Sequence, residues 1–341
     1  MKNLYKLIIL TLFSSILYVS CDLEENPPFL AENNVYTSVD GASAALNGIY
    51  SSLANFSYYS ADFHHATLYM SGLFVTKKPT DKNTIGSLSP EPSMNYTTNL
   101  WRVSYQTIAR TNDMIANVPS DSNDDQLNNI LGISYFLRAH TYFNLVRLYG
   151  GVPLHTEPAT GSSLNKPRSN VDAVYALIIA DAENAKKLMF NAGSQSSGRP
   201  GKEAASMLLA KVYMTLAAND NASPNWKKAY DEAIQVYGKY SLVSNYGDLW
   251  ASESTANNNS ESIFEIQFNE ENASRLTRLF TPNAAFLGRG WERFRINPEV
   301  IDAHNATYPG DARIDFTFRS EYIKPTNNKP VKVYPSTTRK N

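Results

Sequence analysis

The sequence has one cysteine and almost no imbalance of charge, and each feature excludes a class of protein. A single Cys in 341 residues forms neither a disulfide framework nor a zinc site built from several thiolates. Lys and Arg number 31 against 32 Asp and Glu, so no basic excess exists to neutralise phosphates, and we expect no nucleic-acid partner. Hydrophobic residues make up 43% of the chain, which is enough for a sizeable buried core.

Sequence motifs for catalysis, metals and cofactors are also missing. No G-x-S-x-G nucleophile elbow and no H-E-x-x-H metal motif occurs, and Gly201-Lys202 lacks the other residues of a phosphate-binding loop. His64 and His65 are adjacent and point apart on a helix or strand, so we expect no shared metal. His140 is predicted to be a packed or surface residue. The sequence therefore predicts no cofactor, no metal and no catalytic residue.

The N-terminus carries the pattern of a secretory signal. Lys2 and Lys6 precede an apolar stretch over residues 7–19, and the only cysteine, Cys21, follows at once. This arrangement resembles a bacterial lipoprotein signal, in which the cysteine is acylated; the alternative is an ordinary signal peptide with a leftover cysteine. The acidic residues after Cys21 resemble the surface-export signal of Bacteroidetes lipoproteins. We expect residues 1–20 to be a signal peptide, 21–40 a lipid-anchored tether, and no later membrane-spanning segment.

Steps of three and four between apolar residues predict a series of helices. Asp40 is expected to cap the first, which ends near Leu53. Further helices are predicted over 99–118, 125–149, 171–190 and 202–218, with a fifth beginning near Trp226. They come in adjacent pairs with small residues where helices approach closely, which is typical of tetratricopeptide-like stacking. We therefore predict a mainly α fold of helix pairs over residues 41–250, with an inserted loop at 56–98.

The pattern changes after Tyr246. Residues 262–268 alternate as a half-buried strand, and the rest of 251–341 is rich in Pro, Gly and Asn. Trp101 lies on a helical stripe and is predicted to be core, whereas Trp250 is predicted to be a structural plug.

Several blocks in order resemble the SusD/RagB family. The run from Tyr135 to Leu154, which contains Arg138-Ala139-His140 and ends in Gly150-Gly151-Val152-Pro153-Leu154, resembles the family's central signature. Residues 101–115, 168–175, 198–213, 261–268 and 311–315 resemble other landmarks of the family. The resemblance implies a SusD-like superhelix of tetratricopeptide-like helix pairs that carries an irregular ligand-binding part over 251–341.

The resemblance also implies a role and a location. SusD-like proteins are outer-membrane lipoproteins that bind glycans or related nutrients and cover a SusC-like TonB-dependent transporter; the helices would face the transporter and the loops the ligand. Family members usually run longer, so we expect residues 251–341 to be incomplete at the C-terminus and an apolar face of the helical stack to be uncovered. Two alternatives remain. One is a helical-repeat adaptor that binds only protein. The other is a glycoside hydrolase, because the distance between two catalytic carboxylates is set by the fold and does not follow from the sequence.

Nutrient capture needs flat apolar faces for sugar rings and polar groups for hydroxyls. Loop residues of these kinds concentrate between 283 and 293, namely Asn283, Phe286, Arg289, Trp291 and Arg293. The resemblance places ligand contacts in this loop and in the long loop before Trp101. From the two loops we predict as ligand-binding residues Trp291, Arg289, Asn283, Tyr69 and Phe74.

Overall fold

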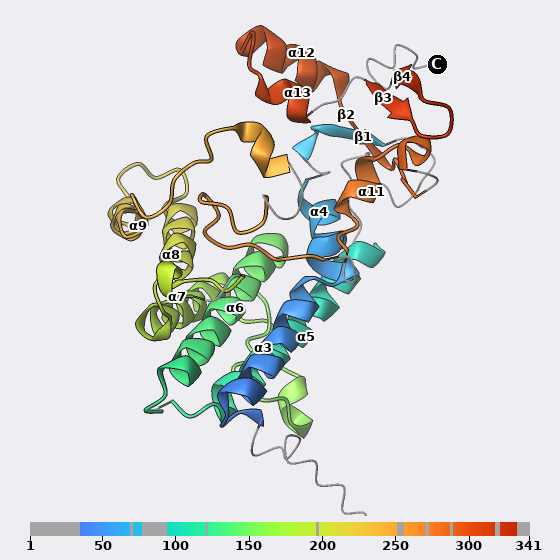
Figure 1. Cartoon of the computed structure of the whole chain (residues 1–341). Coiled ribbons are helices and arrows are strands. Elements are labelled where there is room, and N and C mark those ends of the chain that lie inside the picture. The colour runs from blue at the N-terminus through green and yellow to red at the C-terminus, as the bar shows by residue number, and fades with distance from the viewer. Residues whose placement is uncertain are drawn as a thin grey trace, which may run out of the picture.

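A computed structural model describes residues 35–68, 71–76, 94–120, 122–195, 198–250, 256–269, 273–286, 289–317 and 321–332. Its larger part is a stack of α-helices, and a smaller part of short helices and strands lies at one end of that stack (Figure 1). The stack consists of α3 (Val39–Leu53), α5 (Asn95–Asn117), α6 (Asp125–Tyr149), α7 (Val171–Leu188), α8 (Lys202–Ala217) and α9 (Asn225–Ile234). The predicted mainly α, tetratricopeptide-like fold is confirmed.

Neighbours in the sequence are neighbours in the stack. Helix α6 packs against α5 and α7, α8 packs against α7 and α9, and α3 closes the other end against α5 and α6. One continuous core runs through them, from Leu46 and Ile49 in α3 to Leu209 and Val212 in α8. Each hairpin buries its apolar face on the next, so burial of roughly 25 cal/mol per Å² of apolar surface holds the stack together.

Capping residues fix where these helices begin. Asp124 accepts hydrogen bonds from the backbone amides of Gln126 and Leu127, and Asn170 accepts one from the amide of Ala173. The predicted cap of the first helix was wrong. Ser38 caps this helix, and Asp40 lies in its first turn.

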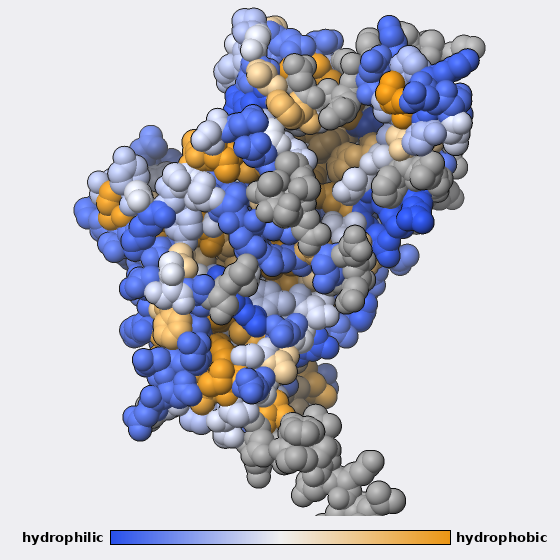
Figure 2. Space-filling view, in the orientation of Figure 1, coloured by the Kyte–Doolittle hydropathy of each residue, from blue (hydrophilic) through white to orange (hydrophobic). Residues whose placement is uncertain are grey.

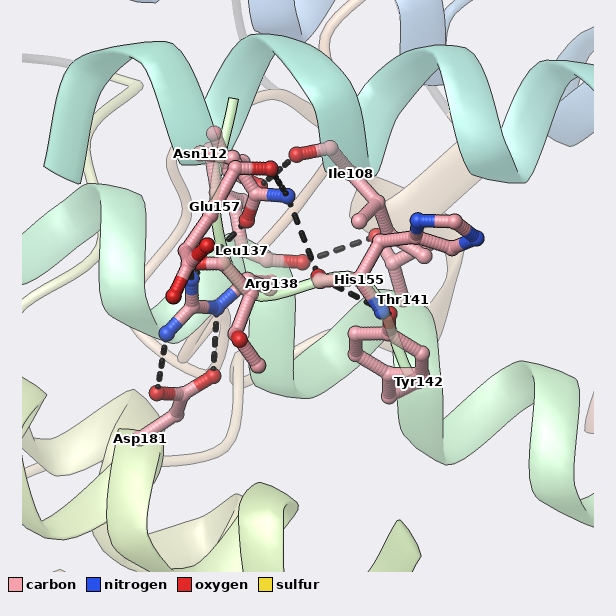
Figure 3. Close-up of polar contacts among 11 residues, drawn as sticks. Ile108, Asn112, Leu137, Arg138, Thr141, Tyr142, His155, Glu157 and Asp181 are labelled. Carbon is pink, nitrogen blue, oxygen red and sulfur yellow. Dashed lines mark hydrogen bonds and ion pairs between the residues drawn. The ribbon is translucent and has the colours of Figure 1, made fainter. Parts of the chain in front are cut away.

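The family signature in α6 builds a buried polar network between three helices and a loop (Figure 3). The guanidinium of Arg138 donates two hydrogen bonds of 2.8 Å to the two carboxylate oxygens of Asp181 in α7. It also donates to Oδ1 of Asn112 in α5 and to the carbonyl of Thr156. Because Arg138 and Asp181 are only 4% and 2% exposed, water cannot replace these bonds. Burial raises the pKa of the Asp181 carboxyl, and the arginine opposes that rise.

The same network fixes the loop that follows α6. The side-chain amide of Asn112 donates hydrogen bonds of 3.0 Å to the carbonyls of His155 and Glu157. The hydroxyl of Tyr142 accepts from the His155 amide and donates to the His155 carbonyl. Arg138, Asn112 and Tyr142 therefore satisfy backbone groups that a buried loop would otherwise leave unpaired.

The segment predicted as an inserted loop contains short elements in its described residues. They are the π-helical turn η1 (Phe56–Ser60), α4 (Asp62–Thr67) and β1 (Phe74–Thr76). Polar side chains hold η1 against α6. The hydroxyl of Tyr59 lies 2.6 Å from Nε2 of His140, and the amide of Asn144 donates to the hydroxyls of both Tyr58 and Tyr59. His140 is thus packed, as predicted, and links the insertion to the stack.

Short elements from both ends of the chain form the smaller part (Figure 1). They are β1 together with η6 (Tyr246–Trp250), α11 (Leu276–Phe280), η7 (Asn283–Phe286), β2 (Phe294–Ile296), α12 (Pro298–Thr307), α13 (Arg313–Thr317), β3 (Glu321–Lys324) and β4 (Lys329–Lys332). Two further turns, η4 (Gly161–Leu164) and η5 (Ala192–Ser194), lie in the connections α6–α7 and α7–α8 of the stack. Strands β1 and β2 pair antiparallel with Phe74 opposite Ile296, and β3 pairs antiparallel with β4. A second small core lies here, built on Ala61, Met94, Tyr96, Leu279 and Phe294.

Two predictions about the later chain were wrong. Residues 262–268 are extended but pair with no strand in the described part of the chain; Ile263, Phe264 and Ile266 instead pack onto the core of the stack. The alternation reflects side-chain packing on helices, which does not require a sheet. Trp250 is 61% exposed and meets only the edge of the Tyr246 ring, so it is not a plug.

The helical stack has an open end at α9. This helix packs mainly against α8, and its outer surface exposes Tyr230 and Ile234, with Tyr237 just beyond its end. Figure 2 shows hydrophobic surface at this end of the molecule. Among the described residues, α9 therefore presents an apolar surface to solvent.

Candidate ligand-binding site

The two loops that the sequence analysis selected lie together. The β1–β2 pairing joins the end of the inserted segment, Phe74–Thr76, to Phe294–Ile296, more than 200 residues later in the chain. The hydroxyl of Ser60 in η1 also accepts a hydrogen bond from the amide of Arg275. The two loops therefore pack on the small core around Leu279 and Phe294, and η1 connects them to the helical stack.

Backbone hydrogen bonds set the position of the loop that carries Trp291. The amides of Trp291 and Arg293 donate to the carbonyls of Arg278 and Leu279 at 2.7 and 2.8 Å. Gly290 is buried at this contact, where a Cβ would lie 2.3 Å from the Thr281 carbonyl oxygen. Only glycine permits the approach, so the Gly-rich sequence before Trp291 has a steric reason.

Trp291 is presented beside a second aromatic ring and a cation. Its indole is half-buried and meets Phe56 edge to face at 6.4 Å between centroids. The guanidinium of Arg293 lies 5.2 Å from the indole centroid, within range of a cation–π contact. Phe56 is 42% exposed, so the two rings form apolar surface that reaches solvent.

Glu292 turns the chain immediately after Trp291. Its φ of 44° lies in the left-handed region, which is unfavourable for a residue with a side chain and is found most often at functional sites. Its buried carboxylate accepts hydrogen bonds from the guanidinium of Arg295, one of them 3.0 Å long. This ion pair holds the strained turn and therefore the direction of the indole.

The predicted site residues have different surroundings. Arg289 is exposed next to Gly290, and the Asn283 side chain donates to the Gly290 carbonyl at 3.1 Å, so Asn283 braces the loop. Phe74 packs on Phe280 at 5.2 Å and belongs to the border of the small core. The sequence thus brought Asn283, Arg289 and Trp291 together correctly; contact with a ligand stays a prediction for all of them.

Two predicted residues, Cys21 and Tyr69, lie outside the described residues. The sequence analysis missed Phe56, because its partner is 235 residues away and its own Tyr- and Ser-rich surroundings show no pattern. We call the surface formed by Phe56, Arg278, Arg289, Trp291 and Arg293 the Trp291 platform. Figure 2 shows a hollow between the α12 end and the β3–β4 hairpin, with hydrophobic surface at its base.

The platform combines flat apolar surface with hydrogen-bond donors, which suits a sugar ring and its substituents. No group of three or more His, Cys, Asp or Glu residues within the described ranges is arranged to hold a metal ion. Within the same ranges no helix has the length and apolarity needed to cross a bilayer.

A separate hollow of about 290 Å³ lies on the helical stack, between α5 and the loop after α6. Trp101 and Tyr105 form its aromatic wall, and Trp101 also packs on the core as predicted. His155 lines it as well, where burial and the nearby Lys166 lower the pKa of the imidazole. The hydroxyl of Tyr105 donates a hydrogen bond to the Pro153 carbonyl, and Glu157 and Lys166 also line this hollow.

Comparison with known proteins decides the family. Residues 33–214 match the family model SusD-like_3, whose description is starch-binding associating with outer membrane. The chain belongs to the SusD-like family. It is 26% identical to SusD-like protein P25 of Formosa agariphila over 276 residues, which are 73% of this chain and 49% of P25. The SusD-like chain thus spans about half the length of this curated relative.

Solved SusD-like structures share the fold. A SusD superfamily protein of Bacteroides thetaiotaomicron superposes with a TM-score of 0.64 at 25% identity, over 79% of this chain and 62% of that one. A laminarin-binding SusD-like protein superposes with a TM-score of 0.63 at 23% identity, over 80% of this chain and 65% of that one. The SusD-like superhelix that the signature in α6 implied is therefore confirmed.

Proposed function

We propose that this SusD-like chain is a non-catalytic cell-surface lipoprotein that binds oligosaccharides of a nutrient glycan at the Trp291 platform. It would hand them to a SusC-like TonB-dependent transporter in the outer membrane. The observation that carries the proposal is the half-buried indole of Trp291, held by a strained turn beside Phe56 and Arg293. Rigid loop aromatics next to donors suit sugar rings, and the family description and the laminarin-binding relative support this choice.

Attachment to the membrane is the second element of the proposal. The acyl chains would be carried by Cys21, and the residues between Cys21 and the start of α3 would serve as the tether. Acyl chains add about 0.8 kcal/mol of membrane affinity per buried methylene, so more than one chain is needed for a stable anchor. The helical stack would face the transporter, which leaves the platform toward the ligand.

Glycan binding is tested by titrating the purified protein with a panel of polysaccharides and following heat or retardation in a glycan-containing gel. Trp291→Ala is expected to weaken binding by about tenfold or more, since it removes the central aromatic contact. Trp250→Ala is the matched control, because it removes an exposed tryptophan outside the platform. Equal losses in the two variants, or no glycan binding by the unaltered protein, would contradict the proposal.

Two further measurements test the remaining parts. Radiolabelled palmitate should enter the unaltered protein in its cell and not the Cys21→Ala variant.

Reducing ends should not accumulate when the protein is incubated with the glycan that it binds; their release would favour the hydrolase alternative. Capture of a protein partner with no effect of glycan or of Trp291→Ala would favour the adaptor alternative.

A further inference from the structure

Positive charge is concentrated in the segment that builds the Trp291 platform. Residues 273–296 contain five arginines and a single glutamate, with no lysine or aspartate, although the whole chain has 31 basic and 32 acidic residues. The arginines are Arg275, Arg278, Arg289, Arg293 and Arg295. Glu270, Glu271 and Glu299 flank this segment, so the excess of arginine is confined to the residues around the indole.

The only acid of the segment does not neutralise the arginines around Trp291. The Glu292 carboxylate is buried and paired with Arg295. The guanidiniums of Arg278, Arg289 and Arg293 make no hydrogen bond or ion pair with another described residue, and those of Arg289 and Arg293 are exposed. Arg293, whose guanidinium lies 5.2 Å from the indole centroid, and the exposed Arg289, two residues before Trp291, are the cations that this surface presents.

The fold, and not only the sequence, gathers these cations. The backbone of residues 278–281 runs beside that of 290–293 through the hydrogen bonds of Trp291, Glu292 and Arg293, which places Arg278 at the same loop. Strand β3 lies against η7, and the β3–β4 hairpin adds Lys324, Lys329 and Lys332 against Glu321 alone. In this hairpin Lys324 lies opposite Lys329, whereas Lys332 lies opposite Glu321.

We infer that the glycan bound at the Trp291 platform is anionic, with carboxylate or sulfate groups on its sugars. The inference rests on the proposed function and names the ligand class of the same site. Trp291 and Phe56 would pack against sugar rings, while the guanidiniums of Arg289 and Arg293 would donate paired hydrogen bonds to the anionic groups. The planar guanidinium matches carboxylate and sulfate oxygens in a way that hydroxyl groups of a neutral sugar do not require.

The experiment compares ligands that differ only in charge. Isothermal titration would use short oligogalacturonate against the same oligosaccharide after carboxyl reduction, and carrageenan oligosaccharide against its desulfated form. We expect one charged member to bind at least about tenfold more tightly than its neutral partner, since hydrogen bonds to ionised groups are the strong ones. The preference should shrink as ionic strength rises from about 0.01 M to about 0.15 M, because exposed charges are screened. The pair that shows the preference distinguishes carboxylate from sulfate.

Variants locate the effect. Arg289→Gln and Arg293→Gln should each weaken binding of the charged ligand by about tenfold, and by several times more than they weaken binding of the neutral partner. Arg102→Gln is the matched control, because Arg102 is an exposed arginine on α5 outside the platform. If all three substitutions weaken binding of the charged ligand equally, the attraction comes from the overall charge of the protein, and the inference is overturned.

The outcomes separate this inference from the proposed function. If neutral glycans bind as well as charged ones and Trp291→Ala abolishes both, the proposed function holds and the anionic class is wrong. If no glycan of either kind binds, both fail. Inorganic sulfate that competes as well as the sulfated oligosaccharide would show a simple anion site and would also overturn the inference.

Discussion

The guanidinium of Arg138 donates four hydrogen bonds in the polar network between the stack helices and the loop after α6. It bonds at once to Asp181, Asn112 and Thr156, and thereby fixes the distance between α5, α6 and α7. An ion pair so deeply buried adds little net stability, because desolvation offsets the attraction, but it strongly favours one arrangement of the three helices. The family signature around Arg138 is thus a requirement of packing and not of ligand binding.

Breaking this pair should be costly. Arg138→Met leaves the Asp181 carboxylate buried without a partner, so the free energy of unfolding should fall by about 3–5 kcal/mol. Urea denaturation measures the change. The double variant Arg138→Met with Asp181→Leu should recover most of the loss, because both charges are then absent. If the double variant is no more stable than the single one, the loss comes from packing and not from the unpaired charge.

His140 is expected to make the stability of the protein depend on pH. Burial, with Arg147 and Lys211 nearby, lowers the pKa of its imidazole to about 4. In the unfolded chain the pKa is about 6.5, so between these values the unfolded state binds a proton that the native state does not. Stability should therefore fall by up to about 1.4 kcal/mol per pH unit as pH drops from 6.5 toward 4.

The variant His140→Gln removes the titrating group while keeping an acceptor for the Tyr59 hydroxyl. The difference in unfolding free energy between the unaltered protein and this variant should change with pH only in that window. Urea melts at a series of pH values measure it. A difference that stays constant from pH 7 to pH 4 would show that His140 titrates alike in both states.

At the scale of the element, the loop over 289–293 depends on close backbone contact more than on side chains. Gly290 touches the carbonyls of Thr281 and Pro282, and Trp291 follows directly. The caps at Asp124 and Asn170, by contrast, stabilise single helices by about 1 kcal/mol each and do not touch the platform.

Gly290→Ala should displace the loop, since the new methyl group meets backbone oxygens that cannot move as a flexible side chain would. We expect glycan binding to be lost while the far-ultraviolet circular dichroism of the helical stack is unchanged. Gly193→Ala is the control, because a Cβ there meets nothing within 4 Å. Unchanged binding in Gly290→Ala would mean that the loop does not set the position of Trp291 for the ligand.

At the scale of the whole molecule, the protein has two cores of unequal size. The large one runs through the helices, and the small one lies under the platform around Leu279 and Phe294, with Ala66 touching both. The two parts are joined through η1, where Ser60 bonds to Arg275, and through α5, whose Tyr96 lies in the small core. We predict that the platform opens locally without loss of the stack.

Leu279→Ala tests this division. It creates a cavity in the small core and should cost about 2–5 kcal/mol locally. Hydrogen exchange should rise across residues 274–296 and stay slow in α6 and α7. Leu209→Ala, a fully buried change in α8, should instead speed exchange in both parts. Equal acceleration everywhere in Leu279→Ala would show one cooperative unit.

The open end at α9 also belongs to this scale. Its exposed Tyr230 and Ile234 follow helical spacing, which a sequence pattern alone interprets as a core-facing stripe. Only the position of α9 at the end of the stack makes this stripe a surface.

The amino-acid sequence by itself determined the helices, because periodic apolar residues, caps and the Gly150–Gly151 stop are local signals. It also predicted the family, since the signature around Arg138 combines packing requirements that few sequences share. It could not determine that Phe56 meets Trp291, that residues 262–268 lie on helices and not in a sheet, or that Trp250 is exposed. Those depend on contacts between segments up to 235 residues apart, and such contacts are fixed by the tertiary structure alone.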